Sequence, residues 1–148
     1  MLTTIRHSNA DWHKDLKKRL ASSRGRVAIG FPVGTNQSSI NKAYANEFGS
    51  EESSDLGQPI PARPFMKHSV PRIKHEAVNI ASHGKLEDVT DTLERIGAAG
   101  VEAIVDTINM GGFQENSDYT LERKQGTQPL VDSGDMRGDV TFKVEGAE

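Results

Sequence analysis

The chain has 148 residues, of which 34% are hydrophobic and 26% are charged, and it contains no cysteine. This length suits one domain with a core of its own, so we expect a single domain over residues 1–148. The lack of cysteine excludes disulfide frameworks and thiol nucleophiles. No run approaches the roughly 18 apolar residues of a membrane span, and the N-terminus has no signal-peptide pattern, which predicts a soluble protein that is not exported by that route.

The net charge of −3 is unevenly distributed along the chain. Lysine and arginine dominate residues 1–26, whereas aspartate and glutamate dominate residues 85–118. Opposite patches on one small chain favour head-to-tail association between copies or docking on a charged partner. The alternative is that both patches are solvated helix faces. No membrane partner is expected.

A helix is predicted over residues 10–22. Trp12, Leu16 and Leu20 recur every four residues and form a narrow apolar stripe, which needs a surface to pack on. No known nucleic-acid motif accompanies this helix, so direct sequence recognition is not favoured. Its last turns carry a basic cluster that suits the helix dipole and is a candidate interface: Lys17, Lys18 and Arg19.

The next elements are predicted to be a strand, a turn and a short helix. Residues 26–31 alternate between polar or small and apolar, as a half-buried strand does. Residues 32–36 form the turn. Residues 40–48 have the spacing of a short helix that leads into an extended piece, although residues 44–49 also alternate like a strand. Residues 49–58 are rich in serine and carboxylates and are expected to form a mobile acidic loop.

The segment Pro59–Phe65, which we name the proline strap, is expected to be extended. Each of its prolines fixes φ and moves the preceding residue out of the helical region. Two interpretations of its side chains stay open. In one, Arg63 and Phe65 form part of a protein–protein interface. In the other, Phe65 fills the core of its own domain while Arg63 pairs with a nearby carboxylate such as Glu47.

Two longer helices are predicted after the strap. The first is expected beyond Phe65 and is ended by Gly84, with Pro71 tolerable only in its first turn. The second, over residues 86–109, shows the strongest helical periodicity in the chain, and its centre Gly97–Gly100 permits close approach of another element. Its acidic residues include two interface candidates, Glu94 and Glu102.

The last part of the chain is predicted to hold one helical turn over residues 119–124, two turns over residues 128–137 and a strand over residues 139–144. Residues 145–148 are expected to fray. The fold class that follows is α+β: a small antiparallel sheet packed against one N-terminal helix and one or two longer central helices.

No catalytic site, metal site or cofactor is predicted. His68 and His75 lie two helical turns apart, but two ligands without a third make a weak metal site, and exposed helix histidines are commoner. Ser133 lies among the carboxylates of residues 132–135, yet no Gly-x-Ser-x-Gly elbow surrounds it, so a turn is favoured over a nucleophile. The sequence therefore favours a protein that acts by binding.

Three motifs occur in a fixed order: Asn46–Gly49, then Pro61–Phe65, then Pro129–Arg137. Together, with a helical stretch between the second and the third, they resemble the small neck or tail-completion proteins of long-tailed bacteriophages. Ser133 stands where that family usually has threonine. The matching structural residues are Asn46, Glu47, Phe48, Gly49, Pro61, Pro64, Pro129, Leu130, Asp132, Ser133 and Gly134.

The resemblance implies a structural virion protein of the head-to-tail junction, assembled in the host cytoplasm. Such a protein forms a ring of six or twelve copies that joins the head connector to the tail terminator or tail tube, with packaged DNA in its lumen. In such a ring the basic helix of one copy is expected to meet the acidic helix of the next, or else to line the lumen through which DNA passes. A tail terminator or another minor tail protein is the nearest alternative. Outside this class, a small nucleic-acid-binding protein or a small hydrolase stays open.

Overall fold

The computed structural model describes residues 14, 24–51, 59–83, 88–116, 121–122 and 127–146. The predicted helix over residues 10–22 lies outside the described residues except for Lys14, as does most of the loop expected over residues 49–58. The described elements are, in chain order, strand β1 (Arg26–Gly30), helix α2 (Gln37–Phe48), helix α3 (Phe65–His83), helix α4 (Val89–Met110), short helix α6 (Asp135–Gly138) and strand β2 (Thr141–Glu145).

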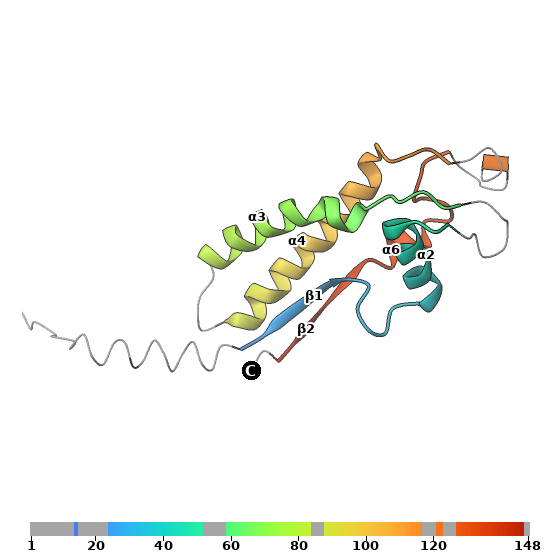
Figure 1. The fold of residues 1–148 in the computed structure, drawn as a ribbon. Coiled ribbons are helices and arrows are strands. Elements are labelled where there is room, and N and C mark those ends of the chain that lie inside the picture. Colours follow the sequence, from blue (N-terminus) through green and yellow to red (C-terminus); the bar gives the residue numbers. More distant parts are fainter. Residues whose placement is uncertain are drawn as a thin grey trace, which may run out of the picture.

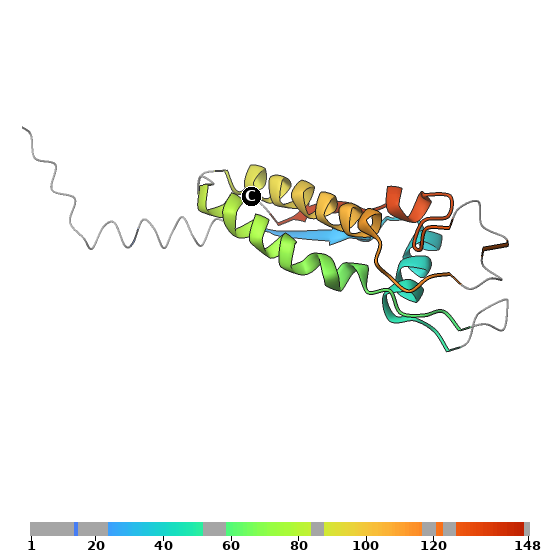
Figure 2. The same ribbon diagram turned by 90° about the horizontal axis from the view of Figure 1, so that it is seen from above.

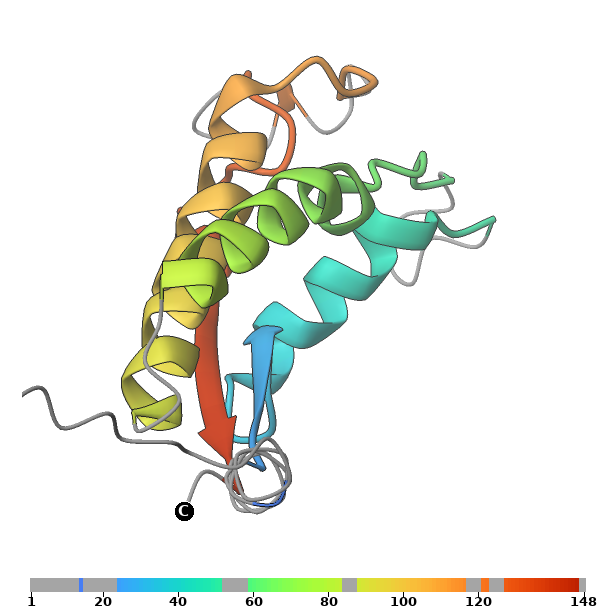
Figure 3. The same cartoon turned by 90° about the vertical axis from the view of Figure 1, so that its left-hand side faces the viewer.

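Helices α3 and α4 run side by side over a two-stranded antiparallel sheet (Figure 1, Figure 2). α4 contacts both strands, whereas α3 packs mainly on α4. The strands pair in register from Arg26 opposite Glu145 to Gly30 opposite Thr141. α2 and α6 lie toward one end of the sheet (Figure 1, Figure 3). This arrangement confirms the α+β fold class that the sequence predicts.

Two glycines bring α4 close to the sheet. A Cβ atom added at Gly97 would lie 2.3 Å from the ring of Phe142, and one added at Gly100 would lie 2.6 Å from Cδ1 of Ile29. Because Ile29 and Phe142 are paired across the sheet, the two glycines receive neighbouring side chains of one sheet face. The close approach predicted for the Gly97–Gly100 segment is therefore confirmed.

The fully buried core lies where the start of α3, the second half of α4, and the elements α2 and α6 meet. Phe65, Ile104 and Ile108 have no exposed surface. We call this part of the molecule the closed end, and its buried cluster consists of Ala43, Phe65, Ile104, Ile108, Leu130, Met136 and Val140. Burial of this kind contributes about 25 cal/mol per Å² of apolar surface, so the closed end supplies most of the described hydrophobic stabilisation.

Several predicted boundaries differ from the structure. The helix expected between Phe65 and Gly84 runs from Phe65 to His83, but Pro71 lies inside it and not in its first turn. The helix starts more than one turn before Pro71 because α2 supplies acceptors to its first N–H groups, as described below. The strand expected over residues 139–144 runs from Thr141 to Glu145. It begins later than predicted because the residues before it form the short helix α6, which ends at Gly138 and was predicted as a turn.

The helical interpretation of residues 40–48 is confirmed, and the helix is longer than predicted. α2 starts at Gln37 because the side chain of Asn36 accepts a hydrogen bond from Ser38 N at 2.9 Å, which is the usual role of an N-cap asparagine. The fraying expected from residue 145 is wrong for Glu145, which is the last residue of β2 and pairs with Arg26 at 2.6 Å.

Candidate functional site: a clasp around Arg63 and an exposed aromatic pair

The first two sequence motifs bind each other and form one unit, which we call the clasp (residues 46–50 and 60–65). Ser50 N donates to Ile60 O at 2.9 Å, and Ile60 N donates to Ser50 O at 2.8 Å. Gly49 has φ +74°, and a Cβ atom there would lie 2.8 Å from Ile60 O. The glycine of the first motif is therefore required both by its backbone conformation and by the approach of the proline strap.

Arg63 is the centre of the clasp. Only 6% of its surface is exposed, and burial lowers the pKa of its guanidinium. Its backbone N–H donates to Asn46 O at 2.5 Å. Its guanidinium donates to the segment that follows α4 and to α2, with these acceptors: Gln114 O at 2.8 Å, Asn46 Oδ1 at 3.1 Å, Glu115 O at 3.1 Å and Asn116 Oδ1 at 3.3 Å. These four acceptors are all neutral. The Arg63 side chain therefore acts as a donor of several hydrogen bonds and links the proline strap to α2 and to residues 114–116.

Glu47 has a different role from the predicted pairing with Arg63. Its two carboxylate oxygens accept hydrogen bonds from the backbone of α3, from Met66 N at 2.8 Å and from Lys67 N at 3.0 Å. A carboxylate at this position satisfies two free N–H groups and suits the positive end of the helix dipole. The last turn of α2 thus caps α3, which explains why α3 begins before Pro71.

The burial of the strap decides between its two interpretations. Phe65 is fully buried in the closed end and Arg63 is nearly so, both within a single chain. Side chains this deep are not available to a neighbouring molecule, so their predicted role as interface residues is wrong. Phe65 fills the core of its own domain, as the other interpretation expected, while Arg63 binds neutral acceptors and not Glu47.

The third motif closes the same end of the molecule. Leu130 is buried with φ +67°, and Met136 is buried in α6. Ser133 Oγ donates to Asp135 Oδ2 at 2.5 Å within the turn that starts α6. The turn interpretation of Ser133 therefore agrees with the structure. The second and third motifs thus place Phe65, Leu130 and Met136 in the closed end, whereas Phe48 of the first motif is exposed.

An exposed aromatic pair lies on α2, directly beside the clasp. Tyr44 and Phe48 are 68% and 66% exposed, and their ring centroids are 4.8 Å apart. They occupy positions i and i+4 of one helix face. Met110, at the end of α4, is another large apolar side chain in solvent, with 78% exposure. The sequence predicted a helix here but not which face it buries, so it did not identify these residues as surface.

The charged interface candidates have different positions. Lys17, Lys18 and Arg19 lie outside the described residues. Glu94 is exposed on α4. Glu102 is exposed but faces α3, with Arg72 at 3.8 Å, and the same arginine pairs with Asp106 at 2.6 Å. This link between α3 and α4 was not predicted.

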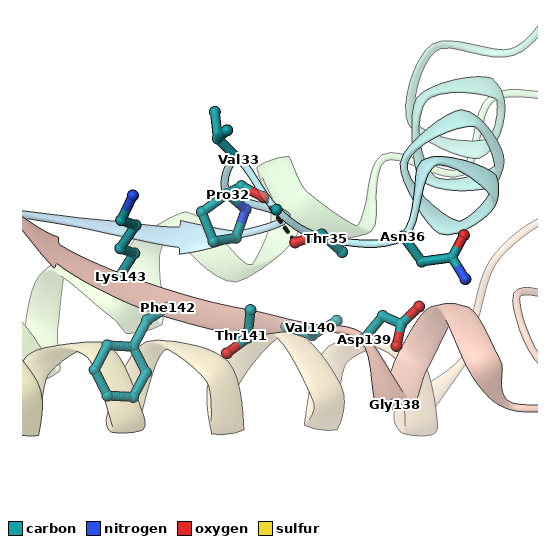
Figure 4. Close-up of a pocket in the computed structure, with 11 residues that line it drawn as sticks. Pro32, Val33, Thr35, Asn36, Gly138, Asp139, Val140, Thr141, Phe142 and Lys143 are labelled. Carbon is teal, nitrogen blue, oxygen red and sulfur yellow. Dashed lines mark hydrogen bonds between the residues drawn. The ribbon is translucent and has the colours of Figure 1, made fainter.

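A shallow groove lies between the turn after β1 and the start of β2 (Figure 4). Its volume is about 490 Å³, and residues 32–36 and 138–143 line it. Its acidic side chain, Asp139, accepts a hydrogen bond from Ser39 at 2.5 Å, and its basic side chain, Lys143, pairs with Glu145 at 3.4 Å. Since both charges are already engaged within the chain, the groove presents no assembled reactive or ligand-binding group.

The described residues contain no group of three or more histidine, cysteine, aspartate or glutamate side chains that could hold a metal. His68 stacks on Phe113 with ring centroids 5.6 Å apart. None of the described helices is both long and apolar enough to cross a membrane. A scan against protein-family models and searches of curated proteins and of solved structures find no match. The candidate functional feature is the exposed aromatic pair of Tyr44 and Phe48 on α2.

Proposed function

We propose that this protein is a structural subunit of a phage head-to-tail junction, which assembles as a ring and joins the head connector to the tail. The sequence motifs provide the resemblance. The observation that carries the proposal is the aromatic pair, because two adjacent aromatic rings in solvent form an apolar patch, and aromatic residues are enriched at protein interfaces. A tail terminator is the alternative within the same class.

The support beneath the pair suits this role. Asn46 and Glu47 lie between Tyr44 and Phe48 in sequence, and both are fixed by hydrogen bonds to the proline strap and to α3. The aromatic side chains are therefore presented on a backbone that has little freedom left to lose on binding. Tyrosine and other aromatic residues are also enriched at the centres of interfaces.

A closed ring requires that one patch meets a different patch on the next copy. In the proposed ring, the Tyr44–Phe48 pair is the patch that one copy presents to the next. Met110 belongs to a different element and is exposed to 78%, so it offers an apolar contact of another kind on the same chain. The expected interface has aromatic rings on one side and the flexible thioether on the other.

The test measures assembly of the full chain by native mass spectrometry and negative-stain imaging. The wild type is expected to form a closed oligomer, and the Tyr44→Ser, Phe48→Ser double variant is expected to run as a monomer with an unchanged circular dichroism spectrum. Lys42→Ser, on an exposed position of the same helix, is the matched control and should assemble normally. A wild type that stays monomeric at high concentration would contradict the ring.

A second experiment tests the junction itself. Particles produced without this protein are expected to show separate filled heads and tails, and supplying the wild-type chain should restore joining. Supplying the double variant should not. If heads and tails join normally in its absence, the protein has no role at the junction, whatever its oligomeric state.

A further inference from the structure

The sheet has two unpaired edges. Among the residues that the structure describes, β1 pairs with β2 and neither strand pairs with a third. In an antiparallel pair, alternate residues of each strand direct their backbone N–H and C=O groups away from the partner strand. No backbone hydrogen bond from the described loops reaches these outward groups. Each outer edge is therefore a row of donors and acceptors that matches the spacing of another extended strand.

The two edges lie on opposite sides of the molecule. β2 lies beneath α4, whereas β1 lies on the side of α2 and α3 (Figure 2, Figure 3). One face of the sheet is covered by α4, which Ile29 and Phe142 contact. Ala28 and Lys143 are paired on the other face and are exposed, and Figure 4 shows Phe142 and Lys143 on opposite sides of β2. A strand could thus be added at either edge without displacing a described helix.

The edge of β1 lacks the features that usually prevent such pairing. Natural edge strands carry charged side chains, proline or a bulge. β1 has one charged residue, Arg26, at its start, and no aspartate, glutamate, lysine or arginine occurs from Val27 to Asn41. Its five residues pair with β2 in an unbroken register, and the nearest proline, Pro32, lies beyond the strand. The uncharged edge of β1 is therefore suited to association with a further strand.

We propose that copies of this chain join through a continuous antiparallel sheet, in which the outer edge of β1 pairs with the outer edge of β2 of the next copy. Rotation about a ring axis that runs along the strands keeps the direction of each strand, so this pair is antiparallel, as it is within the chain. Each copy then uses one edge of each kind, which is the heterologous contact that a closed ring requires. Pairing of β1 with β1 would instead end the assembly at two copies.

The charges at the ends of the strands agree with this partner. Arg26 and Glu145 are paired at the end of the sheet where α3 finishes and α4 and β1 begin, which we call the open end (Figure 1). In the continuous sheet, Arg26 also lies close to Glu145 of the next copy, which has the opposite charge. The Tyr44–Phe48 pair is on α2, on the same side as the edge of β1. This inference rests on the proposed ring and assigns it a second contact.

Cross-linking tests which edges meet, because the chain has no cysteine of its own. Ala28→Cys and Lys143→Cys each place one thiol on the exposed face of the sheet. The two variants are co-expressed, with a size tag on one, and treated with a short bismaleimide. We expect the mixed dimer to form in several-fold higher yield than the dimer of either variant alone. Ala98→Cys is the matched control for Ala28→Cys, since this exposed alanine lies on α4 away from the sheet that Gly97 and Gly100 face.

The outcomes separate this inference from the proposed ring. An oligomer in native mass spectrometry whose mixed yield is no higher than that with Ala98→Cys would mean that the ring uses other surfaces, and the continuous sheet would be wrong. A dimer of Ala28→Cys alone that equals the mixed dimer would show pairing of β1 with β1 and would also overturn it. A wild-type chain that stays monomeric and variants that give no cross-link would overturn both proposals.

Hydrogen exchange of the wild type provides a measurement that needs no substitution in the sheet. In the oligomer, amides of both strands should be protected at every residue, because the outward N–H groups bind the next copy. In the Tyr44→Ser, Phe48→Ser chain, which is expected to be monomeric, alternate amides of residues 26–30 and 141–145 should exchange several-fold faster. Equal exchange of these amides in an oligomeric wild type and a monomeric variant would contradict the continuous sheet.

Discussion

The closed end and the open end contain the same kinds of apolar side chain but bury them to different depths. At the closed end, Phe65, Ile104 and Ile108 are completely covered, because the strap, α2 and α6 cover the ends of both long helices. At the open end, where α3 finishes and α4 and β1 begin, the described apolar side chains of Val27, Ile80, Leu93, Ile96 and Val144 are all partly exposed, and α4 but not α3 contacts the strands to a significant extent. Full burial of apolar side chains therefore depends on the loops and short elements that cover the helix ends. The long helices α3 and α4 alone do not bury their apolar side chains completely.

The largest effect that would test this comparison is expected from Phe65→Ala. Removing a fully buried ring leaves a cavity, and such changes destabilise proteins by about 3–5 kcal/mol. The free energy of unfolding, measured by urea denaturation of the full chain, should fall by this amount. Val78→Ala is the control, because a side chain that is 70% exposed and lies outside the proposed contact should change stability by about 0.5 kcal/mol or less. Equal losses from both variants would show that the closed end is not the stabilising core.

A smaller loss is expected from Arg63→Ala, which removes the donor at the centre of the clasp. Hydrogen bonds to a charged group contribute about 1.5–3 kcal/mol each, and water can enter the space left by the side chain and bind part of the orphaned acceptors. We therefore expect a net loss of about 2–4 kcal/mol. Hydrogen exchange should accelerate at residues 114–116, which Arg63 holds. Arg63→Lys keeps the charge but not the planar fork, and should recover less than half of the loss. Unchanged exchange at residues 114–116 in Arg63→Ala would contradict this role.

Much of the framework followed from local patterns in the sequence. The periodicity of α4, the small centre Gly97–Gly100 and the alternation of β1 each depend on residues that are neighbours in the chain. The extended strap followed from the φ restriction of its prolines. The presence of these elements was therefore predicted correctly, with boundaries wrong by a few residues.

The candidate site was harder to predict, because its contacts join distant parts of the chain. Arg63 binds Gln114, 51 residues further along, through a backbone carbonyl that has no side-chain signature. Glu47 looked like the natural partner of Arg63 by charge, yet the free N–H groups of α3 compete for the same carboxylate. The exposure of Tyr44 and Phe48 depends on where α2 docks, and the spacing of the residues does not encode that.

A further test concerns the contact between α4 and the sheet, which connects the two ends. Gly97→Ala should gain about 1 kcal/mol in helix propensity. The added Cβ would lie 2.3 Å from Phe142, and overpacking of this kind costs about 1–3 kcal/mol, so we expect a net destabilisation of about 1 kcal/mol. Gly138→Ala is the matched control, since a Cβ there meets nothing within 4 Å. A stabilised Gly97→Ala chain would mean that the sheet moves away from α4 at little cost.

The smallest effect is expected at the rim of the open end, where Arg26 pairs with Glu145. The hydrogen bond from Arg26, and then the one from Lys143, hold the pKa of the Glu145 carboxyl below its ordinary value. Since the folded-state pKa is the lower one, the pair stabilises the fold above the unfolded-state pKa, and this contribution is lost as the pH falls through the folded-state value. Arg26→Ala should raise the Glu145 pKa toward its ordinary value, measured by carbon NMR of the carboxyl group, with exposed Arg24→Ala as the control. Because the pair is accessible to solvent, the free energy of unfolding should change little in Arg26→Ala. An unchanged Glu145 titration in this variant would show that the ion pair does not link the first residue of β1 to the last residue of β2.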